Sequence, residues 1–175
     1  EGLETVTLID GIRAIGDNAF SYCLELKDIN VPETVTSIGS QAFYECDSLE
    51  GILIPDSVIT LGSGVFSYCD SLASITIPGS IRDIPSDAFE SCEKLRQVVM
   101  GEGVESIDSR AFASCNELKK FILPYSIKEL DSWYMFNNTS LKTAGPKGSG
   151  CDVEYGWTEA VPYNAFAHME GLETV

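Results

Sequence analysis

Apolar and polar positions alternate in a pattern that recurs every 23 residues along most of the chain. In one unit, Leu49 is followed by apolar residues at alternate positions and then by Pro55. Alternation with a period of two is typical of a half-buried strand. Because proline cannot donate to a ladder of backbone hydrogen bonds, we expect it to end this strand. The following pattern, from Val58 to Gly62, predicts a second short strand that returns across the far side.

The repeated positions form columns that stay in phase from one unit to the next. The aromatic column consists of Phe20, Phe43, Phe66, Phe89 and Phe112. The leucine column consists of Leu3, Leu26, Leu49, Leu72, Leu95, Leu118 and Leu141. Chance does not produce several such columns with one period, so the chain is built from internal repeats.

The last part of each unit, which contains Ala-Phe and ends in cysteine, is too short for a full helix. We therefore expect one helical or 3-10 turn there. Asn18, Asp87 and Asn164 precede Ala-Phe in their units. Side chains of this type satisfy free backbone N–H groups, and we expect them to do so at this turn.

One unit cannot bury its own apolar side chains, each worth about 1.5–3 kcal/mol when buried. It needs a neighbour on each side, so the units must stack, with equivalent strands in parallel. The pattern therefore predicts a solenoid with a 23-residue period and a parallel β-sheet on one face. Short strands and 3-10 or helical turns form the other side. Residues 1–175 are predicted to be a single solenoid segment of about seven repeats, the first and last partial.

Five of the six cysteines follow the same period. The column consists of Cys23, Cys46, Cys69, Cys92 and Cys115, with Asn138 at the next place. Cysteine and asparagine share compact size and the ability to hydrogen-bond to backbone, which is typical of an inward structural ladder. Coils about 4.8 Å apart keep parallel Cβ atoms somewhat beyond disulfide range, so we expect free, buried thiols. A zinc site is not favoured, because the chain has one histidine and no Cys-x-x-Cys.

The repeat L-x-x-I-x-I-P-x-x-V-x-x-I-G-x-x-A-F-x-x-C, which extends from Cys23 to Phe166, resembles the BspA-type leucine-rich repeat, also described as the Treponema pallidum class. This resemblance implies a curved leucine-rich-repeat solenoid. It also implies a secreted or cell-surface location in gut or oral bacteria or mucosal protists, with adhesion to host matrix proteins and other microbes. It supplies no catalytic residue, no shared binding residue and no cofactor.

The unit that opens at Leu141 carries eight more residues than the others before Val161 resumes the pattern. We predict an insertion at about 144–160 that forms a protruding loop or small hairpin on one edge. Aromatic residues in or near it are candidate partner contacts, because exposed rings often anchor recognition. They are Tyr155, Trp157, Trp133, Tyr134 and Tyr163. The alternative is that the loop folds back and its rings cover a flank of the solenoid.

A second candidate surface is the outward row of the predicted sheet. It contains the aliphatic residues Leu53, Val99 and Ile122, more than solubility requires. The row is either a contact stripe or a result of β-propensity alone. On another edge, Asp47, Asp70 and Glu93 form an acidic column. This column is typical of a solvated edge, with a weak calcium site as the alternative.

The formal net charge is −16, from 27 acidic and 11 basic residues. Such a surface repels phosphate backbones and anionic lipid, so we expect no nucleic-acid partner. No stretch has the roughly 18 uncharged apolar residues of a membrane span, so we expect no membrane insertion. No nucleophile–base pair or phosphate loop is evident, so we expect no enzymatic activity, metal or cofactor.

The sequence Glu1–Val6 recurs at Glu170–Val175, so the last residues open another unit. Neither end has the polar cap that free solenoids need, which indicates a piece of a longer array with weak end-to-end self-association. The leading function is an extracellular or cell-surface binding module for a protein or glycan on a host or another microbe. A passive structural spacer is the alternative.

Overall fold

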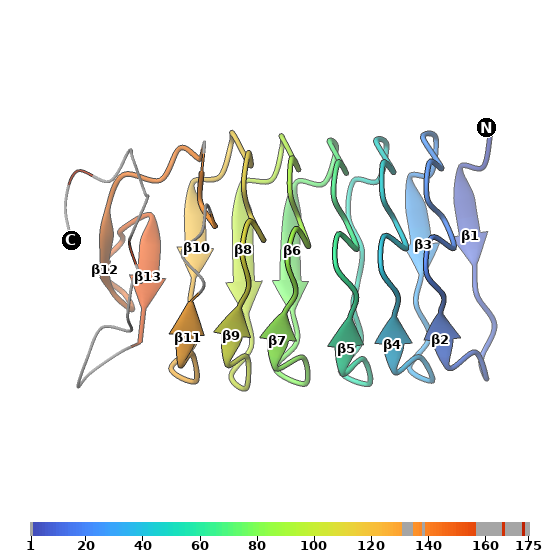
Figure 1. Ribbon diagram of the computed structural model, residues 1–175, viewed down its shortest axis with the longest axis horizontal. Coiled ribbons are helices and arrows are strands. Elements are labelled where there is room, and N and C mark those ends of the chain that lie inside the picture. The colour runs from blue at the N-terminus through green and yellow to red at the C-terminus, as the bar shows by residue number, and fades with distance from the viewer. Residues whose placement is uncertain (1, 131–134, 138, 157–165, 167–172, 174–175) are drawn as a thin grey trace.

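The computed structural model describes residues 2–130, 135–137, 139–156, 166 and 173. Its coils lie side by side along the long axis, from β1 at one end to β12 and β13 at the other (Figure 1). From the first strand to residue 130, residues paired between neighbouring strands are 23 apart in sequence, as in Val6 with Ile29 and Ile75 with Val98. The predicted parallel solenoid with a 23-residue period is therefore confirmed.

The first strand of each coil lies on one face, which we call the front. This face points away from the viewer in Figure 1. Its strands are β1 (Thr5–Thr7), β3 (Asp28–Asn30), β6 (Ser74–Ile77), β8 (Gln97–Met100), β10 (Lys120–Ile122), β12 (Ala144–Pro146) and β13 (Val153–Tyr155). They form two sheets, in the orders β1-β3 and β12-β13-β10-β8-β6. Residues 51–54, which lie between β3 and β6 in sequence and correspond to a front strand, are not part of either sheet.

The return strands lie on the opposite face. They are β2 (Ala14–Ile15), β4 (Ser37–Ile38), β5 (Thr60–Leu61), β7 (Asp83–Ile84), β9 (Ser106–Ile107) and β11 (Glu129–Leu130). These strands also form two sheets, and the pairing is interrupted between β5 and β7. Gly39 and Gly62 each donate a backbone hydrogen bond to the preceding coil, at 2.8 Å. Pro85 occupies the same place in the next coil and has no N–H to donate.

The core is a continuous stack of phenylalanine rings from successive coils. Ring centroids of neighbours lie 5.2–5.4 Å apart with nearly parallel planes from Phe20 to Phe112. Phe43, Phe66 and Phe89 are fully buried. Offset stacking adds to the burial of these large side chains, so the aromatic column ties each coil to the next.

The predicted helical or 3-10 turn is wrong for the described coils, which have consecutive reverse turns instead. The N–H of Ala19 donates to Gly16 and that of Cys23 to Phe20, whereas the intervening N–H of Phe20 donates to Ala42 of the next coil. In a helix, all of these backbone N–H groups would donate within the helix. Here every second N–H group donates to a carbonyl of the neighbouring coil instead. The third residue of the first turn, Asn18, has φ = 55°, as type II geometry requires.

The expectation of a protruding loop or hairpin at the insertion is also wrong for its described residues. β12 and β13 pair in parallel, and β13 inserts between β12 and β10 in the front sheet. Val153 pairs with Phe121 and is fully buried. The extra residues extend the sheet because Val153 provides an inward apolar side chain at the required register. Among the described residues there is no helix with the length and apolar character that a bilayer crossing requires.

Candidate binding surfaces

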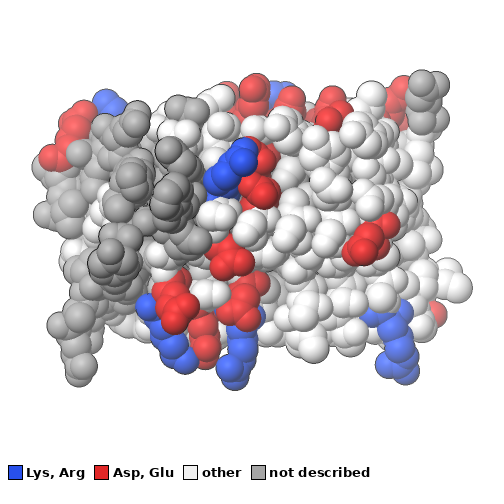
Figure 2. Space-filling view, in the orientation of Figure 1, with Lys and Arg blue, Asp and Glu red and all other residues white. Residues whose placement is uncertain are grey.

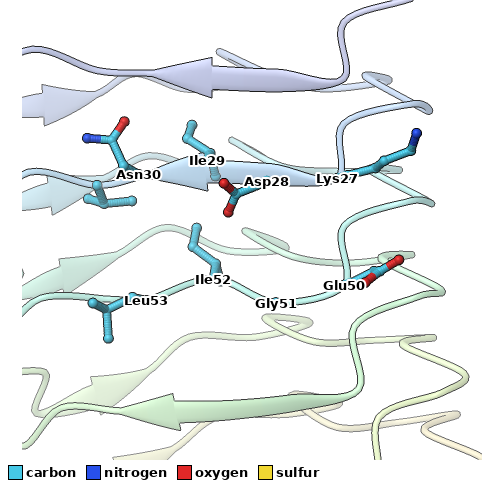
Figure 3. A pocket seen from close by; sticks show the side chains of 9 residues that line it. Lys27, Asp28, Ile29, Asn30, Glu50, Gly51, Ile52 and Leu53 are labelled. Atoms are coloured by element: carbon cyan, nitrogen blue, oxygen red, sulfur yellow. The ribbon is translucent and has the colours of Figure 1, made fainter.

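An open groove of about 610 Å³ runs along the front face where the sheet is interrupted. It lies between β3 and residues 50–53 (Figure 3). Lys27 and Glu50 stand at one end and Asn30 and Leu53 at the other. The lining is mainly apolar, so the groove offers hydrophobic contact between two charged or polar ends.

The backbone on one side of this groove lacks its sheet partners. Among the described residues, no hydrogen bond is formed by the backbone N–H or C=O groups of Gly51, Ile52, Leu53 or Ile54. The adjoining Glu50 carbonyl does accept from Ala73, at 3.2 Å. Of the strands that the structure describes, only β1 pairs with β3, so the edge of β3 toward the groove is free as well. Unpaired strand edges of this kind are templates for another strand.

Gly51 gives a local reason for the interruption. It holds the column position that is occupied by Asp28 in the preceding coil and Ser74 in the following one. Glycine in a strand position has no side chain to pack and is entropically costly to order. The pairing across residues 51–54 is therefore weaker than in the other front coils.

The three predicted aliphatic contacts fall into two groups. Val99 on β8 pairs with Ile122 on β10, so these two half-buried side chains are neighbours. Leu53 lies apart from them at the groove, and its side chain is 77% exposed. Of these three aliphatic residues, Leu53 is the exposed one, and it lies beside unpaired backbone at the groove.

The predicted aromatic contacts are only partly described. Tyr155, on β13, is half-buried, and its ring lies 5.8 Å from that of Phe166. For Tyr155, this packing agrees with the alternative in which the ring covers a flank. The other candidates lie outside the described residues: Trp133, Tyr134, Trp157 and Tyr163.

The Gly-rich part of the insertion encloses a carboxylate of its own chain. The Glu154 side chain accepts hydrogen bonds from the backbone N–H groups of Gly148 and Gly150 and from Lys120 Nζ, at 2.6–3.1 Å. The hydrogen bond from Lys120, followed by those from the glycines, lowers the pKa of Glu154 to about 2. These interactions fix the loop against β10.

The described cysteines of the periodic column are all free, and four of them are fully buried. Each buried thiol donates to the phenylalanine carbonyl of the preceding coil, with S···O distances of 3.1–3.2 Å. The four are Cys46, Cys69, Cys92 and Cys115. Burial raises the pKa of the Cys46 and Cys115 thiols to about 12. Asn138, at the next place, lies outside the described residues.

One surface was not predicted from the sequence. Tyr22, Tyr44 and Tyr68 meet on the turn side of the solenoid, with neighbouring ring centroids 5.4 Å apart. Tyr22 and Tyr68 are 60% and 38% exposed. The available signal was that Tyr22 and Tyr68 are separated by two full periods, with Glu45 between them in the same column. Tyr44 is offset by one residue from that column, which conceals the cluster.

Charge is unevenly distributed over the surface seen in Figure 2. Few charged side chains lie over the coils nearest the N-terminus, whereas basic groups near the centre lie directly against acidic ones. Among the described residues, Arg110 forms an ion pair with Glu90. Within the described part of the chain, no three histidine, cysteine, aspartate or glutamate residues are placed to hold a metal ion.

Comparison with solved structures shows that this chain has the fold of known leucine-rich repeat proteins. A protein from Bacteroides ovatus is 22% identical with a TM-score of 0.69, and the match covers 97% of this chain and 54% of that one. A protein from Eubacterium ventriosum is 24% identical with a TM-score of 0.75, covering 92% and 45%. This chain therefore spans about half the length of these two proteins.

The leucine-rich repeat protein of Treponema pallidum is 28% identical with a TM-score of 0.59, and the match covers 74% of this chain and 69% of that one. A comparison with curated protein sequences found no significant match. The family model for the BspA type leucine rich repeat region matches residues 2–144, in six copies. The chain therefore belongs to the BspA-type leucine-rich repeat family.

Proposed function

We propose that this segment is a non-catalytic, secreted or cell-surface module that adheres to a protein on a host cell or another microbe. We further propose that an extended stretch of the partner pairs with backbone in the groove between β3 and residues 50–53. The observation that carries the proposal is the row of unpaired N–H and C=O groups at Gly51–Ile54 beside an open, mainly apolar groove. Membership of a family of repeat proteins that typically bind proteins supports it.

An extended peptide suits the groove better than a glycan does. A peptide strand supplies alternate N–H and C=O groups, which match those left free along residues 51–54. Its side chains on one face would meet Ile29 and Ile52, which line the groove. Leu53 would contact the other face, because strand side chains alternate. A glycan ligand, by contrast, would use hydroxyl groups and would not need strand register.

Val99, Ile122 and Tyr155 are proposed as additional contacts for a partner that extends beyond the groove along the front face. Each is half-buried and belongs to a strand of the sheet that begins at β6. The proposed roles of Trp133, Tyr134, Trp157 and Tyr163 rest on sequence alone. Loss of binding after substitution of Tyr155, with Leu53 intact, would support the extended contact.

The cysteine column is proposed to be structural rather than reactive. The thiolate is the nucleophilic form, and burial raises the pKa of the Cys46 and Cys115 thiols to about 12. Their hydrogen bonds to phenylalanine carbonyls connect neighbouring coils instead. A large reactive fraction in a thiol titration of the folded protein would contradict this role.

The test measures saturable binding of the segment to an immobilised panel of matrix proteins and glycans. Leu53→Glu places a charge at the groove, and Ile59→Glu makes the same change at an aliphatic residue that is 59% exposed outside it. Binding to a protein that is lost with Leu53→Glu and kept with Ile59→Glu supports the proposal. Binding that survives both changes, or that is confined to glycans, contradicts the groove as the site.

A passive spacer is the second candidate function. The solenoid extends along one axis with its coils side by side, as a spacer requires (Figure 1). If the segment is a spacer, no member of the panel should bind it saturably, and the wild-type and Leu53→Glu segments should give the same result.

A further inference from the structure

We propose that the tyrosine patch formed by Tyr22, Tyr44, Glu45 and Tyr68 binds a proline-rich peptide that carries basic residues, in the polyproline II conformation. The patch lies on the turn side of the solenoid and has no residue in common with the front groove. It is a separate interaction surface with a different kind of partner.

The rings form an exposed and ordered aromatic strip. The planes of Tyr22 and Tyr44 meet at 66° and those of Tyr44 and Tyr68 at 63°, so each ring presents an edge to the next. Rings at this distance are in edge contact, so together they form one continuous, faceted aromatic surface. Aromatic surfaces of this kind are what proline-rich segments dock on in known polyproline recognition.

The backbone holds two of the rings in a conformation that bulky side chains rarely adopt. Tyr22 and Tyr68 both have φ = 61°, in the left-handed region. The equivalent places in two later coils hold the small residues Ser91 and Ser114, also at positive φ. Large side chains are therefore not needed to form this turn. Tyrosine at two such places puts a strained backbone under an exposed ring, as is common at recognition sites.

The spacing of the strip matches a polyproline II helix. Tyr22 and Tyr68 hold the same place in coils that are two apart, and two strand spacings amount to about 9.6 Å. A polyproline II helix repeats its side-chain positions every three residues, with an advance of about 9.3 Å. Prolines at positions i and i+3 of the peptide would therefore meet Tyr22 and Tyr68 in turn.

The charge of the patch selects basic residues in the peptide. Glu45 holds the column position between Tyr22 and Tyr68, and its carboxylate lies beside the Tyr44 side chain, with which it forms a hydrogen bond. An arginine or lysine there would gain an ion pair and cation–π contact together. Asp47 and Asp70 add negative charge near Glu45. Lys94 is a basic group that interacts electrostatically with Asp70.

A polar hollow beside the rings can serve the peptide backbone. It has a volume of about 290 Å³, and its lining includes Tyr44, Tyr68, Gln41, Ser63 and Glu90. A polyproline II helix forms no internal hydrogen bonds and leaves its carbonyl groups available. The amide and hydroxyl groups of this lining can donate to those carbonyls.

The experiment titrates the protein with a 12-residue peptide of repeated Arg-Pro-Pro and measures affinity by calorimetry. Control peptides repeat Glu-Pro-Pro and Arg-Gly-Gly. Tyr22→Asn/Tyr68→Asn is the main variant, because asparagine tolerates the left-handed conformation and the fold should be kept. Glu45→Gln removes the charge alone. Tyr125→Ser removes a tyrosine that is 59% exposed elsewhere and serves as the matched control.

We expect the Arg-Pro-Pro peptide to bind and the double tyrosine variant to weaken it at least about tenfold. Glu45→Gln should weaken binding and reduce its salt dependence, whereas Tyr125→Ser and Leu53→Glu should leave it unchanged. Equal affinity for Arg-Gly-Gly would show that charge alone acts and would overturn the proposal. Unchanged binding by the double tyrosine variant, or no binding of the Arg-Pro-Pro peptide, would overturn it as well.

Discussion

Replacing Phe66 with alanine should cost far more stability than the same change at Phe20, although both side chains hold the same place in their coils. Phe66 is fully buried and stacks on Phe43 and Phe89, each at 5.3 Å between ring centroids. Phe20 is only partly buried, and among the described rings it stacks on Phe43 alone, at 5.4 Å. The comparison therefore isolates what a neighbour on both sides contributes.

The magnitude follows from burial and stacking. Phe-to-Ala changes in a core cost about 3–5 kcal/mol, and each aromatic pair adds roughly 0.5–1.5 kcal/mol. Because Phe66 has two stacking neighbours, we expect Phe66→Ala to lower the free energy of unfolding by about 4–8 kcal/mol. For Phe20→Ala, with part of the burial and one stack, we expect roughly 2 kcal/mol.

Urea unfolding followed by circular dichroism measures both values. A double-mutant cycle adds a second criterion: Phe66 and Phe89 should show a coupling energy of about 0.5–1.5 kcal/mol. The distant pair Phe20 and Phe112 should be additive within about 0.5 kcal/mol. Equal costs at Phe66 and Phe20, or no coupling between Phe66 and Phe89, would refute the view that the stack joins successive coils.

Three further predictions follow from the geometry. The pKa values of Cys46 and Cys115 are raised from about 9 to about 12, so the stability that their neutral thiols contribute is complete below pH 9 and is lost as pH rises toward 12. The loss is up to about 1.4 kcal/mol per pH unit for each thiol, and urea unfolding of Cys115→Ala across this range should show a shallower decline. Gly64→Ala, at φ = 63°, should cost roughly 1–2 kcal/mol, whereas Gln41→Ala at the equivalent place should change stability by less than about 0.5 kcal/mol in the same assay. The pKa of Glu154 is lowered to about 2, so its stabilising effect is present above about pH 4.5 and is lost as pH falls toward 2; thermal unfolding of Glu154→Gln should lack this acid-dependent component.

The period, the parallel stacking and the aromatic column were predictable because they depend on side chains that repeat in sequence. The turn conformation was not, because it depends on donors such as the Phe20 N–H, which bond to a coil 22 residues away. The insertion at about 144–160 was predicted from its eight extra residues, and the structure has β13 within it, at Val153–Tyr155. Its position between β10 and β12 depends on pairing that no local pattern specifies.

The candidate surfaces were only partly predictable. Leu53 was identified by its outward column, but the open groove beside it depends on missing backbone bonds at Gly51, and one glycine is a weak signal for that. Tyr22 and Tyr68 hold a column that also contains Glu45, Ser91 and Ser114, so their exposure and their contact with Tyr44 emerged only in three dimensions. End-to-end self-association stays a prediction, to be measured by concentration-dependent light scattering.

Amide hydrogen exchange of the free segment tests most directly whether the front sheet has a gap for a partner strand. We predict rapid exchange at Ile52 and Leu53, whose N–H groups have no sheet partner, and strong protection at Val98 and Val99 of β8, which is paired on both sides. Addition of a partner that binds in the groove should then slow exchange at Ile52 and Leu53. Equal protection of the two pairs in the free segment would mean a continuous sheet and would contradict the proposed binding site.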